Sequence, residues 1–337
     1  MIRLEQGLTA LKARGIVPQN LRTIGQDYGA LIALVVLILF DLIFTRQFNS
    51  VIAITDLLVH VTPTLILGVG MTLVIATGGI DISVGSIMGL TGILTYLIFS
   101  GKLLGIHNIV LGTAVAIPIA LVVATLIGVI NGVLVTRFNV QPIVATLISL
   151  ITVRGIAEVT VNGFQFAFLS APIVSWLSGN VLGFLPRQVI LMAVIVAFFA
   201  WLMRATAFSR YLLAAGGNQS AARLAGVPVN KVLIIVYTIS GLLAGIAGLA
   251  FIAFDSAANP VTDGLGKELD AIAAVAVGGT PLTGGRATVL GTAIGAIFIQ
   301  LIRQTVVSLN IPDDIASVII GLLIVLAVFL QHQRKAD

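Results

Sequence analysis

The chain has 337 residues, 58% of them apolar and only 9% charged, and its mean hydropathy is +1.15. Because about a quarter of the residues of a water-soluble globule are charged, this composition excludes the soluble class and predicts a polytopic membrane protein. The net charge of +5 comes without a dense basic tract, so we expect no nucleic-acid partner, and the absence of cysteine excludes disulfides, thiolate metal sites and cysteine nucleophiles.

Ten segments, taken in chain order, are apolar enough to predict transmembrane helices. The alternating segments typical of a membrane barrel do not occur, so the predicted fold is an all-α polytopic membrane protein of about ten transmembrane helices with two glycine-rich helix breaks. Segments 188–203 and 267–279 are short enough to be tilted, broken or re-entrant. The predicted spans are residues 28–45, 57–77, 84–100, 109–136, 140–161, 188–203, 231–254, 267–279, 286–309 and 313–331.

The distribution of basic residues predicts the topology. With the N-terminus in the cytoplasm, most of the 18 lysines and arginines fall on the cytoplasmic side, as the positive-inside rule requires. The N-terminus lacks a small-residue cleavage pattern, so we expect the first span to be retained. The predicted organisation begins with a cytoplasmic N-terminal segment at residues 1–27. A transmembrane domain follows at residues 28–331 and contains one long cytoplasmic loop at 204–230. The chain ends in a cytoplasmic tail at residues 332–337.

Glycines at GxxxG spacing within the spans predict close helix packing. Gly128 and Gly132 lie in one span, and Gly241 and Gly245 lie in another. Small residues let helix backbones approach each other closely. We expect these contacts inside one subunit rather than at an interface between two subunits.

Two glycine-rich stretches interrupt the spans. The first, "GGIDISVGS" at residues 78–86, places Asp81 and Ser83 between apolar runs, and the second, "VAVGGTPLTGGR", contains Thr280 and Thr283. In each stretch paired glycines can end one helix, and a hydroxyl residue, Ser83 or the aligned Thr283, can cap the next. Backbone without helix pairing survives at membrane depth only where protein or a water-filled cavity satisfies it. Both breaks are therefore candidates for lining a solute pathway.

Asp81 has two interpretations. As a pathway residue it faces water and binds solute hydroxyls. As a structural residue it caps the helix that begins near Ser83, where the positive end of the helix dipole favours a carboxylate. The two breaks run in the same direction in the predicted topology, so they give no evidence of an inverted repeat.

Further polar groups lie within the spans, where each is costly unless it is paired or faces the bundle interior. Arg154 and Glu158 are four residues apart, which predicts a structural ion pair on one helix face. Asn131 and Gln141 lie near the predicted cytoplasmic mouth, where they either contact a hydroxylated solute or serve as cap and turn residues. All four are candidate pathway residues together with those of the breaks.

The loop between the sixth and seventh spans, "RYLLAAGGNQSAARLAGVPVNK", carries a compact helical signal. Asn218 suits an N-cap, Gly226 suits the C-terminal end, and Pro228 blocks continuation. A short cytoplasmic helix is therefore predicted, and its small side chains suit either the close groove of a partner or a bare surface turn. The residues assigned to a docking role are Gly217, Asn218, Ala221, Ala222, Arg223 and Gly226.

Three stretches carry a resemblance to a known family: "GMTLVIATGGIDISVGSIMGLTG" from Gly70, "AAGGNQSAARLAGV" from Ala214 and "ELDAIAAVAVGGTPLTGGRATVLGTAIGA" from Glu268. In this order and spacing they resemble the membrane permease subunit of ribose-type (monosaccharide) bacterial ABC importers. The resemblance implies a multi-pass permease of the bacterial cytoplasmic (inner) membrane, with both termini cytoplasmic. It also implies translocation of a ribose-like monosaccharide by ATP-driven alternating access.

The resemblance implies partners as well. These are a second permease subunit, identical or related, ABC ATPase subunits, a periplasmic sugar-binding protein and the surrounding membrane lipid. It further implies that residues 218–226 form the coupling helix that docks into the ATPase, although no glutamate precedes Ala214 and Ala215 as it does in better-known coupling signatures. The outer loop at 162–187 is either a surface for the binding protein or buried re-entrant packing.

Motifs that would give the chain a chemistry of its own are missing from the sequence. No G-x-x-x-x-G-K-[ST] phosphate loop occurs, so ATP and Mg are expected on the partner ATPase, with no cofactor, metal or catalytic residue in this chain. No H-E-x-x-H or G-x-S-x-G motif supports an intramembrane enzyme. The main alternative is a stand-alone proton-coupled secondary solute carrier, with Asp81 or Glu158 as the titrating group.

Overall fold

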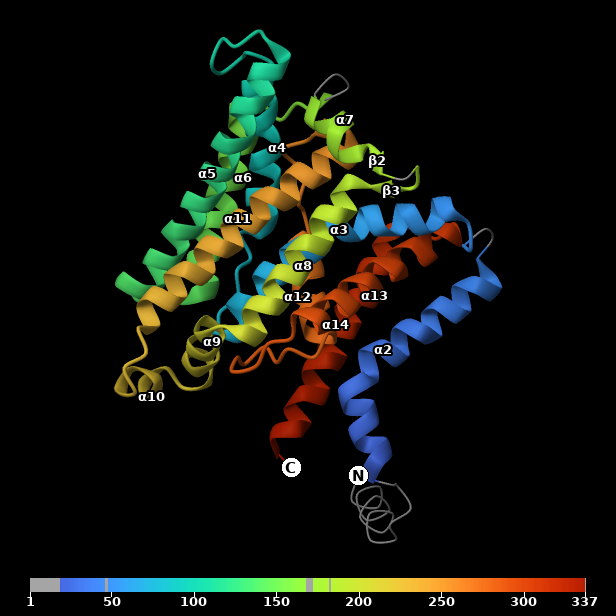
Figure 1. The fold of residues 1–337 in the computed structure, drawn as a ribbon, viewed down its shortest axis with the longest axis vertical. Helices are drawn as coiled ribbons and strands as arrows, with labels where there is room; N and C mark the ends of the chain where they lie inside the picture. Colours follow the sequence, from blue (N-terminus) through green and yellow to red (C-terminus); the bar gives the residue numbers. More distant parts are fainter. Residues whose placement is uncertain (1–18, 46–47, 168–171, 182, 337) are drawn as a thin grey trace.

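A computed structural model of the chain describes residues 19–45, 48–167, 172–181 and 183–336. Most of the predicted N-terminal segment lies outside the described residues. The described chain is mainly helical, with a few two-residue strands (Figure 1). Its elements are α2 (Gln19–Phe44), α3 (Val51–Ala76), α4 (Val84–Phe99), α5 (Ile109–Arg137), α6 (Pro142–Thr160), β1 (Phe166–Ala167), α7 (Pro172–Ser178), β2 (Asn180–Val181), β3 (Leu185–Pro186), α8 (Arg187–Ala205), α9 (Ala207–Gly217), α10 (Gln219–Leu224), α11 (Val229–Asp255), β4 (Ala257–Ala258), α12 (Lys267–Val277), α13 (Val289–Ser308) and α14 (Asp313–Ala336).

Each predicted span corresponds to a helix, but the number of about ten spans is not confirmed. Among the described residues, six helices are long and apolar enough to cross a membrane, namely α3, α5, α6, α8, α11 and α13, and the apolar stretches of α2, α4 and α14 are shorter. α8 is a continuous helix of 19 residues, whereas α12 has 11 and is too short to span a bilayer. The backbone of α14 continues through most of the predicted tail, to Ala336. The fold is an all-α, multi-pass membrane protein.

α3 and α11 form the centre of the bundle. The apolar stretch of α3 is 89% buried and that of α11 is 67% buried, against 28% for α5 and α6 and 22% for α8. Glycines allow the close packing. A Cβ added at Gly128 on α5 would lie 2.3 Å from the Tyr237 carbonyl oxygen on α11, and one added at Gly241 would lie 2.5 Å from the Ala124 carbonyl oxygen. The predicted GxxxG packing within one subunit is confirmed, and the apolar outer faces of α5, α6 and α8 suit lipid.

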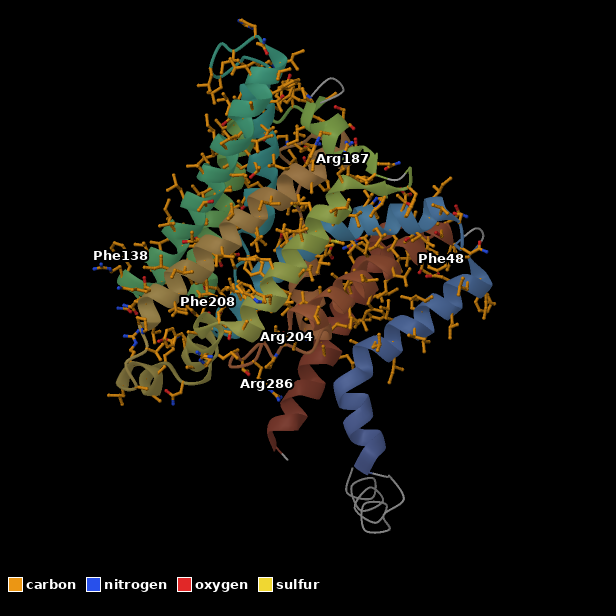
Figure 2. The ribbon with its side chains drawn as sticks, viewed as in Figure 1. Phe48, Phe138, Arg187, Arg204, Phe208 and Arg286 are labelled. Atoms are coloured by element: carbon orange, nitrogen blue, oxygen red, sulfur yellow. The ribbon has the colours of Figure 1, made fainter. Side chains whose placement is uncertain are left out.

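Basic side chains separate between the two ends of the molecule. Figure 1 places α9, α10, the start of α2 and the end of α14 at one end, here called the inner end, and α7 with the α4–α5 turn at the other, the outer end. Arg204 and Arg286 lie toward the inner end, and Arg187 lies at the outer end (Figure 2). This arrangement agrees with the predicted separation of basic residues, while the orientation in the membrane stays a prediction.

The outer loop at 162–187 is folded onto the bundle. β1 pairs antiparallel with β4, matching Phe166 with Ala258, and β2 pairs with β3. α7 lies between β1 and β2 in the chain, and its Trp176 is 61% exposed. Arg187 holds α7 by donating from Nη1 to the Trp176 carbonyl oxygen at 2.8 Å. The exposed tryptophan is compatible with a docking surface at this loop, which stays a prediction.

Candidate functional site

The first break is a tight turn between α3 and α4. Thr77 follows the last residue of α3, and its Oγ1 donates to the Val74 carbonyl oxygen at 2.7 Å. Gly78 adopts a φ of +82°, a conformation that glycine reaches without strain. α4 begins at Val84, so residues 77–83 are non-helical. This turn places Asp81 in the interior of the bundle.

Asp81 is the centre of a buried hydrogen-bond network. Its Oδ1 accepts from the Ser83 backbone amide at 3.1 Å and from Ser83 Oγ at 2.6 Å, and its Oδ2 accepts from Ser240 Oγ on α11 at 2.7 Å. Asn131 on α5 donates from Nδ2 to Ser83 Oγ at 2.9 Å, and Ser149 on α6 donates to Asn131 Oδ1. The network therefore ties the first break to three helices, and satisfied buried networks of this kind rigidify a core.

The contacts of Asp81 are those of the structural interpretation. Its side chain bonds the amide two residues ahead, which is the geometry of an Asx turn, and protein donors occupy both carboxylate oxygens. Asp81, Ser83 and Asn131 are each 0% exposed. None of the three reaches solvent in this conformation, so their roles in a pathway stay predictions.

The second break is longer than the first. α12 ends at Val277 and α13 begins at Val289. Three glycines between these helices have a left-handed backbone, with φ of +88°, +84° and +79°, in the order Gly279, Gly284 and Gly285. Because other residues are strained in this conformation, the glycines define the course of the segment.

Thr288 caps α13, five residues after Thr283, which the alignment matches with Ser83. Its Oγ1 accepts from the Gly291 amide at 2.9 Å, and its own amide donates to Oγ1 of the fully buried Thr280 at 3.1 Å. The left-handed glycine pair that follows Thr283 prevents a helix from starting there. Thr280 therefore supports the second break, whereas Thr283 does not cap α13 and lies in the turn before it.

The two breaks meet at the end of α9. The Gly285 amide donates to the carbonyl oxygen of Ala76, the last residue of α3, at 2.9 Å. A Cβ added at Gly284 would lie 2.7 Å from the Gly78 nitrogen, and one at Gly216 would lie 1.8 Å from the Ala76 oxygen. Backbone packs directly on backbone here, and neither glycine leaves room for a side chain. We call this contact, formed by Gly78, Gly216, Gly284 and Gly285, the glycine junction.

α10 follows the glycine junction almost at once. Asn218 caps its start, since Oδ1 accepts from the Ala221 amide at 3.0 Å. Gly226 closes its end with a φ of +82° and an amide that donates to the Arg223 carbonyl oxygen at 3.0 Å. The helix, its N-cap and its terminating glycine are confirmed as predicted.

Most residues of α10 are exposed in the part of the chain that the structure describes. Ala222 is 5% exposed and packs in a small apolar cluster with α11 residues such as Val229. Ala221 and Arg223 are exposed, and Leu224 is 92% exposed. Among the predicted docking residues, Ala221 and Arg223 are therefore available to a partner, while Ala222 supports the loop itself.

Arg154 and Glu158 do not form the predicted ion pair within the described residues. Arg154 instead donates from Nη1 to the Val261 carbonyl oxygen at 2.8 Å and from Nη2 to the Asp263 carbonyl oxygen at 3.5 Å. The segment between α11 and α12 has carbonyl groups without helical partners, and the guanidinium satisfies two of them. Gln141 is the N-cap residue of α6 and is exposed, but its side chain makes no capping bond. Among the described residues, the hydrogen bonds of the Asp81 network do not include these three side chains.

The sequence analysis missed the hydroxyl partners of the network. Ser240 and Ser149 lie 159 and 68 positions from Asp81, so no local spacing rule links them to it. Ser240 directly precedes Gly241, and the tightly packed glycine face was the one signal that could have drawn attention to it.

Comparisons with known proteins extend over nearly the whole chain. A family model described as branched-chain amino acid transport system / permease component matches residues 53–328. The ribose import permease protein of Escherichia coli strain K12 is 36% identical over 310 residues, which are 91% of this chain and 94% of the relative. The galactofuranose transporter permease protein of the same strain is 35% identical over 314 residues, 90% and 89% of the two chains. The L-arabinose ABC transporter permease protein of Azospirillum brasilense is 32% identical over 335 residues, 98% and 94%. No solved structure gives a significant match.

These findings confirm the resemblance to sugar importer permeases that the three sequence stretches carry. The region matched by the family model begins within α3 and ends within α14, so it contains both breaks, the glycine junction and α10. The chain therefore belongs to the family of membrane transport proteins described as branched-chain amino acid transport system / permease component.

Proposed function

We propose that the chain is the permease subunit of an ABC importer and translocates a monosaccharide, ribose-like in class, by ATP-driven alternating access. Relatives that match almost the entire chain carry the names of ribose, galactofuranose and L-arabinose transporters. The family description names branched-chain amino acids instead. We give the relatives more weight, because their similarity covers 90–98% of this chain, whereas the family model matches residues 53–328, and each of their names specifies a sugar.

The glycine junction is the observation that carries this proposal. It brings the end of α3, the second break and the loop of α10 into backbone contact. A partner that displaces α10 therefore moves the end of the most buried helix and the segment that leads into α13. Because no flexible side chain lies between these backbones, the displacement reaches both breaks, and two arrangements of the breaks provide alternating access.

The proposed partners are assigned to the two ends of the molecule and to its membrane surface. The inner end faces the cytoplasm, so both termini are cytoplasmic and α10 meets an ABC ATPase subunit, which binds ATP and Mg and performs the hydrolysis. A second permease subunit, identical or related, completes the membrane unit. The outer loop with Trp176 faces a periplasmic sugar-binding protein, and the assembly lies in the bacterial inner membrane.

Reconstitution in lipid vesicles tests the function. The chain is purified alone or with its ATPase and binding protein, and uptake of labelled D-ribose is measured. We expect uptake only with ATP and both partners. Uptake by the chain alone, driven by a proton gradient, would instead establish the secondary carrier.

Single-cysteine labelling tests the orientation. The natural chain has no cysteine, so Ser220→Cys on the exposed surface of α10 provides one reactive thiol. We expect an impermeant maleimide to label it in inside-out vesicles and to leave it unlabelled in intact cells. The reverse pattern would place α10 outside and rule out ATPase docking there.

A further inference from the structure

A polar cavity of about 610 Å³ lies between α3, α12 and α13, away from the Asp81 network. Its size falls within the range of about 300–1,000 Å³ that small-molecule sites occupy. It lies at the start of α3 and the end of α13, the helix ends remote from the glycine junction. The polar side chains that line it include Asp56, His60, Lys267, Gln300, Arg303 and Gln304.

A buried carboxylate fixes the two cations of the cavity. Asp270 is 2% exposed, and its Oδ1 lies 2.7 Å from Arg303 Nη2 while its Oδ2 lies 3.5 Å from Lys267 Nζ. The charged side chains of the lining are Asp56, Lys267 and Arg303, and Asp270 behind them pairs with both cations. Because both cations are already paired, they offer no free counter-ion to an anionic solute, whereas they can donate hydrogen bonds to a neutral one.

Further hydrogen-bonding groups lie in the same wall. Gln304 donates from Nε2 to the Ala53 carbonyl oxygen at 3.2 Å, and its buried Oε1 has no hydrogen-bond partner among the described residues. His60 Nδ1 lies 2.8 Å from the Asp56 carbonyl oxygen, so Nδ1 donates and Nε2 of the neutral ring accepts. A solute with several hydroxyl groups can both donate to these acceptors and accept from the cations.

The cavity and the glycine junction lie at opposite ends of the same helices. α3 runs from Val51 beside the cavity to Ala76 in the junction, and α13 runs from Val289 after the second break to Ser308 beside the cavity. The two helices pack against each other in the bundle (Figure 1). A rearrangement at the junction that shifts α3 against α13 therefore changes the shape of the cavity.

We propose that this cavity binds the monosaccharide within the permease chain during translocation. This inference rests on the proposed function and adds the substrate site to it. The paired cations and the amide, imidazole and hydroxyl groups of the lining fit a neutral hydroxylated solute. An amino acid fits less well, because its carboxylate would have to compete with Asp270 for Lys267 and Arg303.

Protection of a single cysteine tests the site directly. Ser308→Cys places a thiol at the cavity, and Leu104→Cys in the exposed α4–α5 turn places a control thiol elsewhere at the outer end. Maleimide labelling is followed in the assembled importer with D-ribose, L-arabinose, D-galactose or L-leucine added. We expect at least one sugar to slow labelling at Ser308→Cys about tenfold at about ten times its Kd, with no effect of L-leucine and none at the control thiol.

Amide variants test the contacts without disturbing the ion cluster. Gln300→Leu and Gln304→Leu remove hydrogen-bonding groups of the cavity, and Gln188→Leu on α8 is a matched control whose buried Oε1 also has no hydrogen-bond partner. We expect the two cavity variants to lose sugar protection of Ser308→Cys and to lower uptake at least about tenfold, while ATPase association and thermal stability stay as in the control. Wild-type uptake by the Gln300→Leu, Gln304→Leu double variant would overturn the proposal.

Two further results would also overturn it. One is ATP-driven uptake of a sugar that never slows labelling at Ser308→Cys. The other is a Ser308→Cys thiol that is unreactive in the assembled importer without sugar, because the second permease subunit would then cover the cavity. Both leave the importer function standing, whereas uptake by the chain alone under a proton gradient removes the proposed function itself.

Discussion

The first break lies inside the bundle and is held by side chains, whereas the second lies at the inner end and is held by backbone and hydroxyl contacts. Asp81 and its partners fasten the first break to α5, α6 and α11. The second break depends on three left-handed glycines, on Thr280, and on the hydrogen bond from the Gly285 amide to the Ala76 carbonyl oxygen. Although the two stretches share a sequence pattern, their surroundings differ, so we expect the first to shift less than the second when α10 moves.

The largest effect is expected where the two breaks touch. In Gly216→Ala the new methyl group would overlap the Ala76 oxygen, so the junction would have to open, at a cost of about 3 kcal/mol or more. Thermal unfolding of the purified chain and ATP-driven uptake measure the result. Gly155→Ala on α6 is the control, because a Cβ there meets no atom within 4 Å. Equal stability of the two variants would contradict the close backbone packing at Gly216 in the glycine junction.

Asp81→Ala and Thr280→Val compare the two breaks. The first change leaves the Ser83 and Ser240 donors without their acceptor, and we expect a loss of about 2–4 kcal/mol, whereas the second removes one acceptor and costs about 1 kcal/mol. Unfolding measurements in detergent give both values. Asp81→Ala should also lower uptake more than it lowers ATPase association. A larger stability loss for Thr280→Val would contradict the expectation that the first break shifts less.

Changes on α10 should affect assembly and leave folding intact. Leu224→Asp and Ala221→Trp alter exposed side chains, and we expect ATPase association to weaken about tenfold or more while the melting temperature is unchanged. Co-purification with the ATPase measures the effect, and Leu103→Asp at the outer end is the control. Unchanged co-purification would refute docking at α10. Ala222 is unsuitable for this test because a large side chain there would disturb its own loop.

The smallest effect concerns α6. Glu158→Gln should change stability by less than about 0.5 kcal/mol, because Glu158 does not pair with Arg154. Arg154→Gln should cost about 1–2 kcal/mol, since two carbonyl oxygens of the α11–α12 connection lose their donor. Unfolding of the two single variants distinguishes these values. A similarly large loss of stability in both variants would support the Arg154–Glu158 ion pair instead.

Features encoded over a few neighbouring residues could be predicted from the sequence. Long apolar runs located the helices, and the order Asn218 to Gly226 gave both ends of α10, because caps depend on residues within one turn. The number of spans could not be obtained in this way, since helices such as α12 are apolar without being long enough to cross a membrane.

Contacts between distant segments lay beyond the sequence patterns. The glycine junction joins Ala76, Gly216 and Gly285, and no spacing rule connects three such positions. The polar cavity combines α3 with α12 and α13 for the same reason. Arg154 was assigned to the wrong partner because its helical neighbour Glu158 was visible in the sequence, while the carbonyl groups that it bonds come from a connection more than 100 residues away.

The short pairing of β1 with β4 has a mechanical consequence for the whole protein. Its backbone hydrogen bonds connect the outer loop to the segment that precedes α12, and α12 leads after 11 residues to the second break. A displacement of the outer loop and a displacement of α10 would therefore both reach the second break, from opposite ends of the molecule.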